Sequence, residues 1–199
     1  MTKVLTFKVE IKGLEEKIWR EIEFTDRRTV ADLAYTILAT FDSLAYHLYN
    51  IKYKSQIFDS WVCVEDRLQF KDLINATTTK LNKLKLKKNE ELEMEYDYGS
   101  TTTFVITLTD QRVMNDFEGY LYPVITDGAG RGMLDDISDF DLKEIVEEID
   151  EKGYSKYYVT PGYEKQEKYD YRKFNLKTNN KKLKGLVLEI KNGYEVSEK

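Results

Sequence analysis

The chain has 199 residues, of which 41% are hydrophobic and 34% charged, and its formal net charge is −5. This composition can supply a buried core and argues against global disorder. The single cysteine and the single histidine exclude an internal disulfide, a multi-cysteine metal site and a multi-histidine zinc site.

The N-terminal segment predicts an antiparallel hairpin followed by a helix. "KVLTFKVEIKG" alternates apolar and polar residues, and "KIWREIEFT" resumes the alternation with Trp19 and Arg20 on opposite faces. The connection "GLEE" is short enough for a hairpin. Residues 29–41 then place apolar side chains at helical spacing, and Thr29 with Asp32 forms an N-cap signal.

The middle of the chain predicts further strands around one segment that is hard to interpret. "AYHLYNIKY" alternates as a strand and contains His47. Residues 54–89 include a possible short helix at "KDLINATTTKLNKL" and the apolar "WVCV". Cys63 in that run is expected to be a small buried hydrophobe, with a reactive thiol as the alternative. A second hairpin is predicted from Glu91–Tyr98 and Thr102–Thr109.

The C-terminal part predicts a loop, a helix and a mixed tail. "GYLYPVITDGAGRGMLDD" has the glycines of a flexible connection. Residues 138–152 form a clear amphipathic helix with Gly153 as a plausible C-cap. In the tail we expect a short helix near "LKTNNKKLK" and a final strand at "LVLEI".

Together these elements predict one α+β domain over residues 1–199. We expect a mixed or antiparallel sheet with a β-grasp-like (ubiquitin-like) core in residues 1–110, and a helix-containing extension in residues 111–199 packed on it. No window approaches the about 20 apolar residues of a membrane span, and no signal peptide is visible. The sequence therefore predicts a cytoplasmic protein without membrane contact.

Three short stretches in the first half resemble one family. "KIWR", "TVADL" and "HLY" resemble, in order, a strand end, a helix start and a strand of the Ri-plasmid ORF-three-like family. "MEYDYGSTT" resembles the family's acidic hairpin, except that Ser100 and Thr101 stand where the family tends to carry an acid, and Thr102 near its tryptophan. A glycine-bearing loop, here "YPVITDGAGRG", and an aromatic motif, here "YDYRKFNL", follow in the same order. The residues that carry the signature are Trp19, Arg20, Tyr96, Tyr98 and Gly99.

The resemblance implies a protein associated with plasmids or other mobile elements, and it implies no reaction. Some members of the family carry a resolvase name, which the residues do not support. A recombinase needs an activated nucleophile among clustered arginines, whereas the arginines here are scattered along the chain.

Four residues are candidates for binding a ligand: His47, Asp97, Asp127 and Arg131. His47 is either a partly buried ring held by a hydrogen bond or an acid–base group. Asp97 either accepts backbone N–H groups or pairs with Arg20, or it is a functional carboxylate. "TDGAGRG" lacks the pattern of a Walker or dinucleotide-binding loop, so it is either a connection or an anion site assisted by Arg131.

Three classes of function follow from these candidates. The first is a non-enzymatic binding or protein-interaction module whose partner is an unknown protein or small ligand. The second is a small hydrolase or transferase that uses His47 and Asp97 as acid–base groups. The third is a nucleic-acid-binding accessory protein that uses the Lys-rich tail. We predict no metal site and no cofactor, and we assign no catalytic residue.

Overall fold

A computed structural model describes residues 1–59, 73–159 and 167–196. The strands of the main sheet are β1 (Lys3–Ile11), β2 (Trp19–Thr25), β3 (Tyr49–Tyr53), β4 (Gln56–Asp59), β5 (Leu73–Asn75), β6 (Glu91–Tyr96), β7 (Thr102–Val113) and β8 (Val124–Ala129). The remaining elements are α1 (Val30–Thr40), α3 (Asp139–Lys152), α4 (Leu176–Val196), the 3-10 turns η1 (Leu81–Lys83) and η2 (Gly119–Leu121), and the short strands β9 (Tyr158–Val159) and β10 (Glu167–Lys168).

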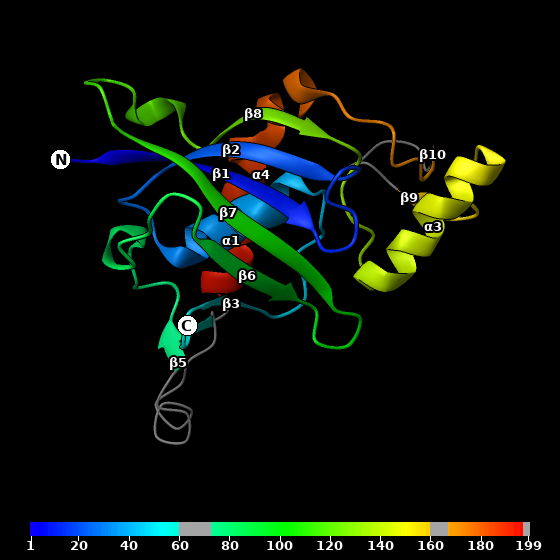
Figure 1. The fold of residues 1–199 in the computed structure, drawn as a ribbon, viewed down its shortest axis with the longest axis horizontal. Helices are drawn as coiled ribbons and strands as arrows, with labels where there is room; N and C mark the ends of the chain where they lie inside the picture. Colours follow the sequence, from blue (N-terminus) through cyan, green and yellow to red (C-terminus); the bar gives the residue numbers. More distant parts are fainter. Residues whose placement is uncertain (60–72, 160–166, 197–199) are drawn as a thin grey trace.

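The eight strands lie in the order β5-β4-β3-β6-β7-β1-β2-β8. Neighbouring strands are antiparallel except β4 and β5, which are parallel. Helices α1 and α4 lie behind the sheet in Figure 1, and α3 lies beyond one end of it. The predicted α+β class with a mixed sheet is confirmed. The β-grasp-like arrangement is not confirmed, because β6 and β7 stand between β3 and the first hairpin and continue the sheet to eight strands.

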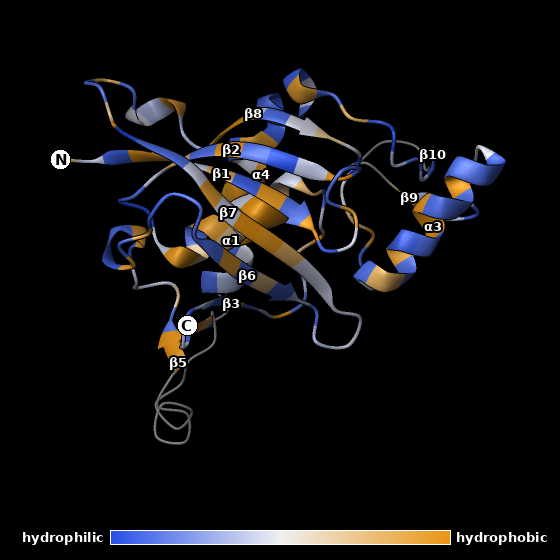
Figure 2. Ribbon diagram, in the orientation of Figure 1, coloured by the Kyte–Doolittle hydropathy of each residue, from blue (hydrophilic) through white to orange (hydrophobic). Residues whose placement is uncertain are grey.

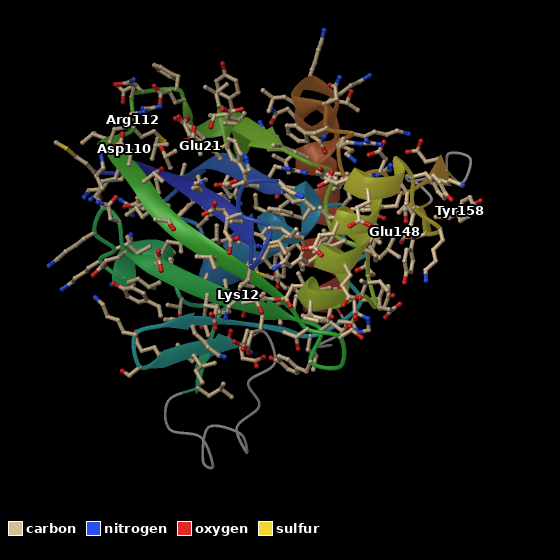
Figure 3. All side chains as sticks on the ribbon, turned by 45° about the vertical axis from the view of Figure 1, so that its right-hand side comes forward. Lys12, Glu21, Asp110, Arg112, Glu148 and Tyr158 are labelled. Carbon is tan, nitrogen blue, oxygen red and sulfur yellow. The ribbon has the colours of Figure 1, made fainter. Side chains whose placement is uncertain are left out.

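The two faces of the sheet differ in polarity, as the alternating sequences predict. In β1, Phe7, Val9 and Ile11 are fully buried on the face toward the helices. Figure 2 shows the matching hydrophobic positions along β7 and α1. The opposite face is polar and bears Lys12 and Glu21, both labelled in Figure 3. The hydrophobic core therefore lies between the sheet and the two long helices.

Helix α1 starts with the capping box that the sequence predicts. Thr29 Oγ1 accepts from Asp32 N at 3.0 Å, and Asp32 Oδ2 accepts from Thr29 N at 3.1 Å. Asp32 Oδ1 also accepts from Lys191 Nζ of α4 at 2.8 Å. One buried carboxylate thus caps α1 and joins it to α4.

Replacing Asp32 with asparagine should lower stability by about 1–2 kcal/mol near neutral pH. Burial opposes ionisation of Asp32, but the bonds from Lys191 Nζ and Thr29 N outweigh burial and lower the pKa of this carboxyl. A carboxyl with a lowered pKa stabilises the folded state above its unfolded pKa, and this contribution is lost as pH falls through the folded value. Urea unfolding should show that the difference in unfolding free energy between the wild type and Asp32→Asn narrows below about pH 4. A difference that stays constant with pH would contradict this assignment.

The C-terminal tail differs from the prediction of a short helix and a strand. Residues Leu176–Val196 form one helix of 21 residues, α4. Leu183, Val187, Ile190 and Tyr194 recur at helical spacing and pack against the core. The run "LVLEI" has the composition of a strand, but Val187 and Ile190 belong to this longer helical stripe, while Leu188 is exposed.

The glycine-bearing stretch also differs from the predicted loop, because its residues Val124–Ala129 form strand β8. Trp19 pairs with Ala129, and Arg20 with Gly128, across β2 and β8. A Cβ at Gly128 would lie 2.9 Å from Trp19 O, so glycine allows the close approach of β2. Gly130 has a φ of +73°, in the left-handed region that favours glycine.

In the middle of the chain, one expectation is confirmed in part, one is wrong and one lies outside the described residues. The strand expected at "AYHLYNIKY" is confirmed over Tyr49–Tyr53 but does not include His47. "KDLINATTTKLNKL" holds β5 and η1 instead of a short helix. Its Asn75 forms a polar turn, with Oδ1 accepting from Thr77 N at 2.8 Å, which competes with helix formation. Cys63 lies in residues 60–72, outside the described part. Within the described residues, no helix is long and apolar enough to cross a membrane.

Candidate functional site

His47, Asp97 and Asp136 converge beside the end of the β3–β6 pair. His47 Nε2 lies 2.8 Å from Asp136 Oδ1 and 3.5 Å from Asp97 Oδ2. One possible ligand atom from each residue lies within 4.8 Å of the others. We call these three residues the His47 cluster.

Strand register places His47 beside Asp97. Tyr49 of β3 pairs with Tyr96 of β6, so the residue before Tyr49 meets the residue after Tyr96, and Asp97 N donates to Leu48 O at 3.0 Å. Because Leu48 is bonded to Asp97, the preceding residue His47 lies next to the Asp97 carboxylate. The cross-strand pair, and not the sequence distance of fifty residues, determines this half of the site.

Asp97 is fixed in the turn that follows β6. Its φ of +59° is uncommon for a residue with a side chain, and its side chain is only 9% exposed. Oδ1 accepts from Gly99 N at 3.0 Å, which leaves Oδ2 directed to His47. Gly99 therefore positions the candidate carboxylate. The expected alternative, a pair with Arg20, is wrong, because Arg20 donates to backbone carbonyls of Trp19, Thr40 and Ala129.

Aromatic residues hold His47 from two sides. The ring centroids of Tyr46 and His47 lie 4.3 Å apart, and Tyr96 packs edge-on at 5.8 Å. Tyr194 of α4 donates its hydroxyl to His47 O. Tyr194 also stacks on Tyr35 of α1, with ring centroids 5.3 Å apart. The backbone of His47 is thus connected to the two helices behind the sheet.

Asp136 enters the site on the segment that follows the glycines. Its Oδ2 accepts from Tyr46 Oη at 2.5 Å, and hydrogen bonds from Tyr46 and His47 lower the pKa of this exposed carboxyl. The preceding Asp135 anchors the segment: Oδ1 accepts from Ser43 Oγ at 2.8 Å and from Tyr96 Oη at 3.1 Å. Neither aspartate was among the predicted site residues, although the acidic doublet in "MLDD" was a possible signal.

Four large hydrophobic residues that are close in the chain to His47 or Asp97 are exposed. Tyr46 contacts both His47 and Asp136. Tyr98 follows Asp97 in the chain, and its hydroxyl group bonds to Asn50 Nδ2 at 3.2 Å and to Asp59 Oδ2 at 3.3 Å. Leu48 bonds to Asp97 through its backbone, and Leu44 N donates to Asp135 Oδ2 at 2.9 Å. Their exposed fractions are 70% for Leu44, 54% for Tyr46, 45% for Leu48 and 51% for Tyr98. We call these four residues the apolar rim.

The other two sequence candidates lie elsewhere. Asp127 is exposed on β8, where Oδ1 accepts from Gly128 N at 2.8 Å. Arg131 Nη1 lies 2.5 Å from Glu167 Oε1 in an ion pair, and the arginine side chain is 12% exposed. The structure therefore brings together His47 and Asp97 and separates them from Asp127 and Arg131.

The five signature residues divide among the site, the open face of the sheet and the core. Tyr96 and Gly99 support His47 and Asp97 directly, and Tyr98 belongs to the apolar rim. Trp19 lies on the open face of the sheet under Lys8 Nζ, 5.6 Å from its ring centroid. Arg20 is fully buried between the rings of Phe41 and Phe174.

The His47 cluster has the chemistry of a metal-binding site. One imidazole nitrogen and two carboxylate oxygens are ligands that Zn²⁺, Mn²⁺ and Fe²⁺ use in proteins. Three protein ligands leave at least one coordination position open, as in sites that also bind water or a substrate.

The comparisons with known proteins agree with the resemblance seen in the sequence. The chain is similar in fold to a crystal structure of a protein of unknown function from Methanosarcina mazei Go1, with a TM-score of 0.64 and 23% identity. That similarity covers 77% of this chain and 84% of the other. No curated protein matches the chain. Residues 3–178 match the family described as plasmid pRiA4b ORF-3-like protein, and the chain therefore belongs to that family.

Proposed function

We propose that the protein is a binding module that holds a divalent transition-metal ion at the His47 cluster. The convergence of His47 Nε2 with one carboxylate oxygen of Asp97 and one of Asp136 carries this proposal. The sequence predicted no metal site, because Asp136 is 89 residues from His47 in the chain and only the fold brings the two together.

The distances favour a small ion with short bonds. Metal–ligand bonds of about 2.0–2.2 Å in a tetrahedral arrangement separate neighbouring ligand atoms by roughly 3.3–3.6 Å. The 3.5 Å between His47 Nε2 and Asp97 Oδ2 already fits that separation. The 2.8 Å contact with Asp136 Oδ1 needs a widening of roughly half an ångström. Asp136 can make this movement because its side chain is 65% exposed, whereas Asp97 is fixed.

The surroundings favour a ligand on the ion's open side. The exposed ring of Tyr46 offers hydrophobic area beside the metal position. Exposed hydrophobic side chains that form a contiguous patch mark interaction sites. A ligand with an anionic oxygen for the ion and an apolar group for the ring of Tyr46, which contacts both His47 and Asp136, would use both features. This arrangement supports the binding-module hypothesis more directly than a polar surface would.

Replacing Asp97 or Asp136 with asparagine should weaken binding of Zn²⁺ or Mn²⁺ by more than about 10-fold. Loss of an outer-shell partner already costs about 10–100-fold in metal affinity, and these residues are direct ligands in the proposal. Isothermal titration of the whole chain with each ion measures the effect. Asp127→Asn is the matched control, because it removes an aspartate carboxylate away from the cluster and should leave the affinity unchanged.

Two outcomes would overturn the metal proposal. The first is an affinity that Asp97→Asn, Asp136→Asn and His47→Gln all leave at the wild-type value. The second is a wild-type protein that binds neither ion in the titration.

Bound ion should also be released on acidification, because an imidazole must be neutral to coordinate.

A hydrolase or transferase is the second candidate, favoured by the 3.5 Å contact of His47 Nε2 with Asp97 Oδ2. A buried carboxylate that orients a partly exposed imidazole is an arrangement used for general acid–base chemistry. Screening ester and phosphate-ester substrates separates the two candidates, since an enzyme requires turnover that His47→Gln abolishes.

The nucleic-acid hypothesis has less support, because Lys182 and Lys191 of α4 pair with Asp42 and Asp32.

A further inference from the structure

A second potential binding site lies between α1, α4 and the segment before β8. It is a pocket of about 170 Å³. Its walls are formed by Phe24, Tyr122, Pro123, Val187 and Leu188, which come from β2, the β8 approach and α4. None of these residues belongs to the His47 cluster or the apolar rim, so this pocket is a separate feature of the molecule.

Positively charged side chains outnumber negatively charged ones around this pocket. Four charged residues line it: Arg28, Asp32, Lys184 and Lys191. Asp32 and Lys191 neutralise each other in the ion pair that joins α1 to α4. Lys184 Nζ donates to Tyr120 O, which is a neutral carbonyl. Among the described residues, neither Arg28 nor Lys184 has a carboxylate within ion-pair distance. Arg28 is close enough to Asp32 to help lower the pKa of that carboxyl, but the hydrogen bonds of Asp32 go to Lys191 and to the Thr29–Asp32 cap. The Arg28 and Lys184 side chains at the pocket mouth therefore have no carboxylate bonded to them, in a protein whose net charge is −5.

The size of the pocket restricts its occupant. A dry apolar cavity of about 150 Å³ holds one benzene molecule. At about 170 Å³ this pocket has room for one ring or a short branched chain, but not for a nucleotide. Cations placed at the mouth of an apolar pocket bind an anionic group while the wall covers the hydrocarbon part.

We propose that this pocket binds a small organic anion, a monocarboxylate with one ring-sized apolar body. The body lies against Pro123, Val187 and Leu188, and the carboxylate accepts hydrogen bonds from Arg28 and Lys184. Arg28 supplies two parallel donors in the geometry that a carboxylate prefers. This inference does not depend on the metal site.

Benzoate is the probe for this proposal, and benzyl alcohol is its neutral counterpart of similar shape. Titration of the isotopically labelled whole chain should give saturable amide shifts at Arg28, Val187 and Leu188 with benzoate, and weaker binding with benzyl alcohol. Arg28→Gln should weaken benzoate binding by about 10-fold, the equivalent of one charge-assisted hydrogen bond. Arg27→Gln is the matched control, because Arg27 is an exposed neighbouring arginine outside the pocket lining.

A steric variant tests the location independently of charge. Val187→Phe should fill the pocket and abolish benzoate binding, and its amide spectrum should show that the fold is retained. If that variant does not fold, Leu188→Trp serves instead, because Leu188 is 60% exposed and its replacement disturbs little of the core. Equal binding of benzoate and benzyl alcohol would overturn the proposal, as would shifts that map to the His47 cluster or do not saturate.

Discussion

Replacing Gly132 with alanine is expected to destabilise the protein by more than about 4 kcal/mol, which is enough to unfold many domains. A Cβ at this position would lie 2.7 Å from Phe41 Cα and closer still to the carbonyl group of Phe41. These are backbone atoms at the end of α1, and Met133 N donates to the same Phe41 O at 2.8 Å. No side-chain rotation can relieve the overlap, so either the helix end or the segment that carries Asp136 must move.

Urea unfolding of Gly132→Ala and of Gly185→Ala compares the same chemical change at two positions. Gly185 lies inside α4, and a Cβ there would meet nothing within 4 Å. Its replacement should raise stability by about 0.5–1 kcal/mol, since alanine favours a helix interior. A Gly132→Ala protein that unfolds at the wild-type urea concentration would show that the close approach to Phe41 is not required.

Replacing Arg20 with methionine should cost about 3–5 kcal/mol, because this side chain joins three parts of the fold. Nε donates to Thr40 O at 3.1 Å, and Nη1 donates to Trp19 O at 2.8 Å and to Ala129 O at 2.7 Å. The end of α1, strand β2 and strand β8 therefore share one donor group. Methionine fills much of the volume but leaves buried carbonyls without that donor.

Two further variants test whether the loss of stability comes from the buried guanidinium group of Arg20 or from the loss of a positive charge in general. Arg20→Lys should still lose at least about 2 kcal/mol, because an ammonium lacks the planar fork that stacks between Phe41 and Phe174. Arg27→Met removes the same charge from an exposed position and should change stability by less than about 0.5 kcal/mol. Equal unfolding midpoints for Arg20→Met and Arg27→Met would contradict the role assigned to Arg20.

The sequence predicted the elements whose signals are local. The alternation in β1 and β2, the Thr29–Asp32 capping box and Gly153 as the C-cap of α3 each depend on residues within a few positions of one another. His47 and Asp97 were both predicted to lie within strands, and the structure places them just outside the ends of β3 and β6. Their contact could not be derived from the sequence, because it depends on the register of Tyr49 against Tyr96.

The failures came from interactions between distant segments. The glycines before Asp136 indicated a loop, but they allow close approach to β2 and to the end of α1. Strand β8 forms because it pairs with the edge of β2, and the local sequence of residues 124–129 does not indicate that this edge is available. Likewise, the C-terminal strand composition of "LVLEI" was overridden by packing of α4 on α1.

The hydroxyl contact from Tyr194 to His47 has a consequence for the order in which the protein is made. Ribosomes add residues from the N-terminus, so His47, Asp97 and Asp136 are synthesised before α4. Until α4 is synthesised, Tyr194 cannot stack on the ring of Tyr35, and the His47 carbonyl lacks the Tyr194 hydroxyl donor. A ribosome stalled before Leu176 would hold a nascent chain that has every candidate metal ligand but not the helix that supports them.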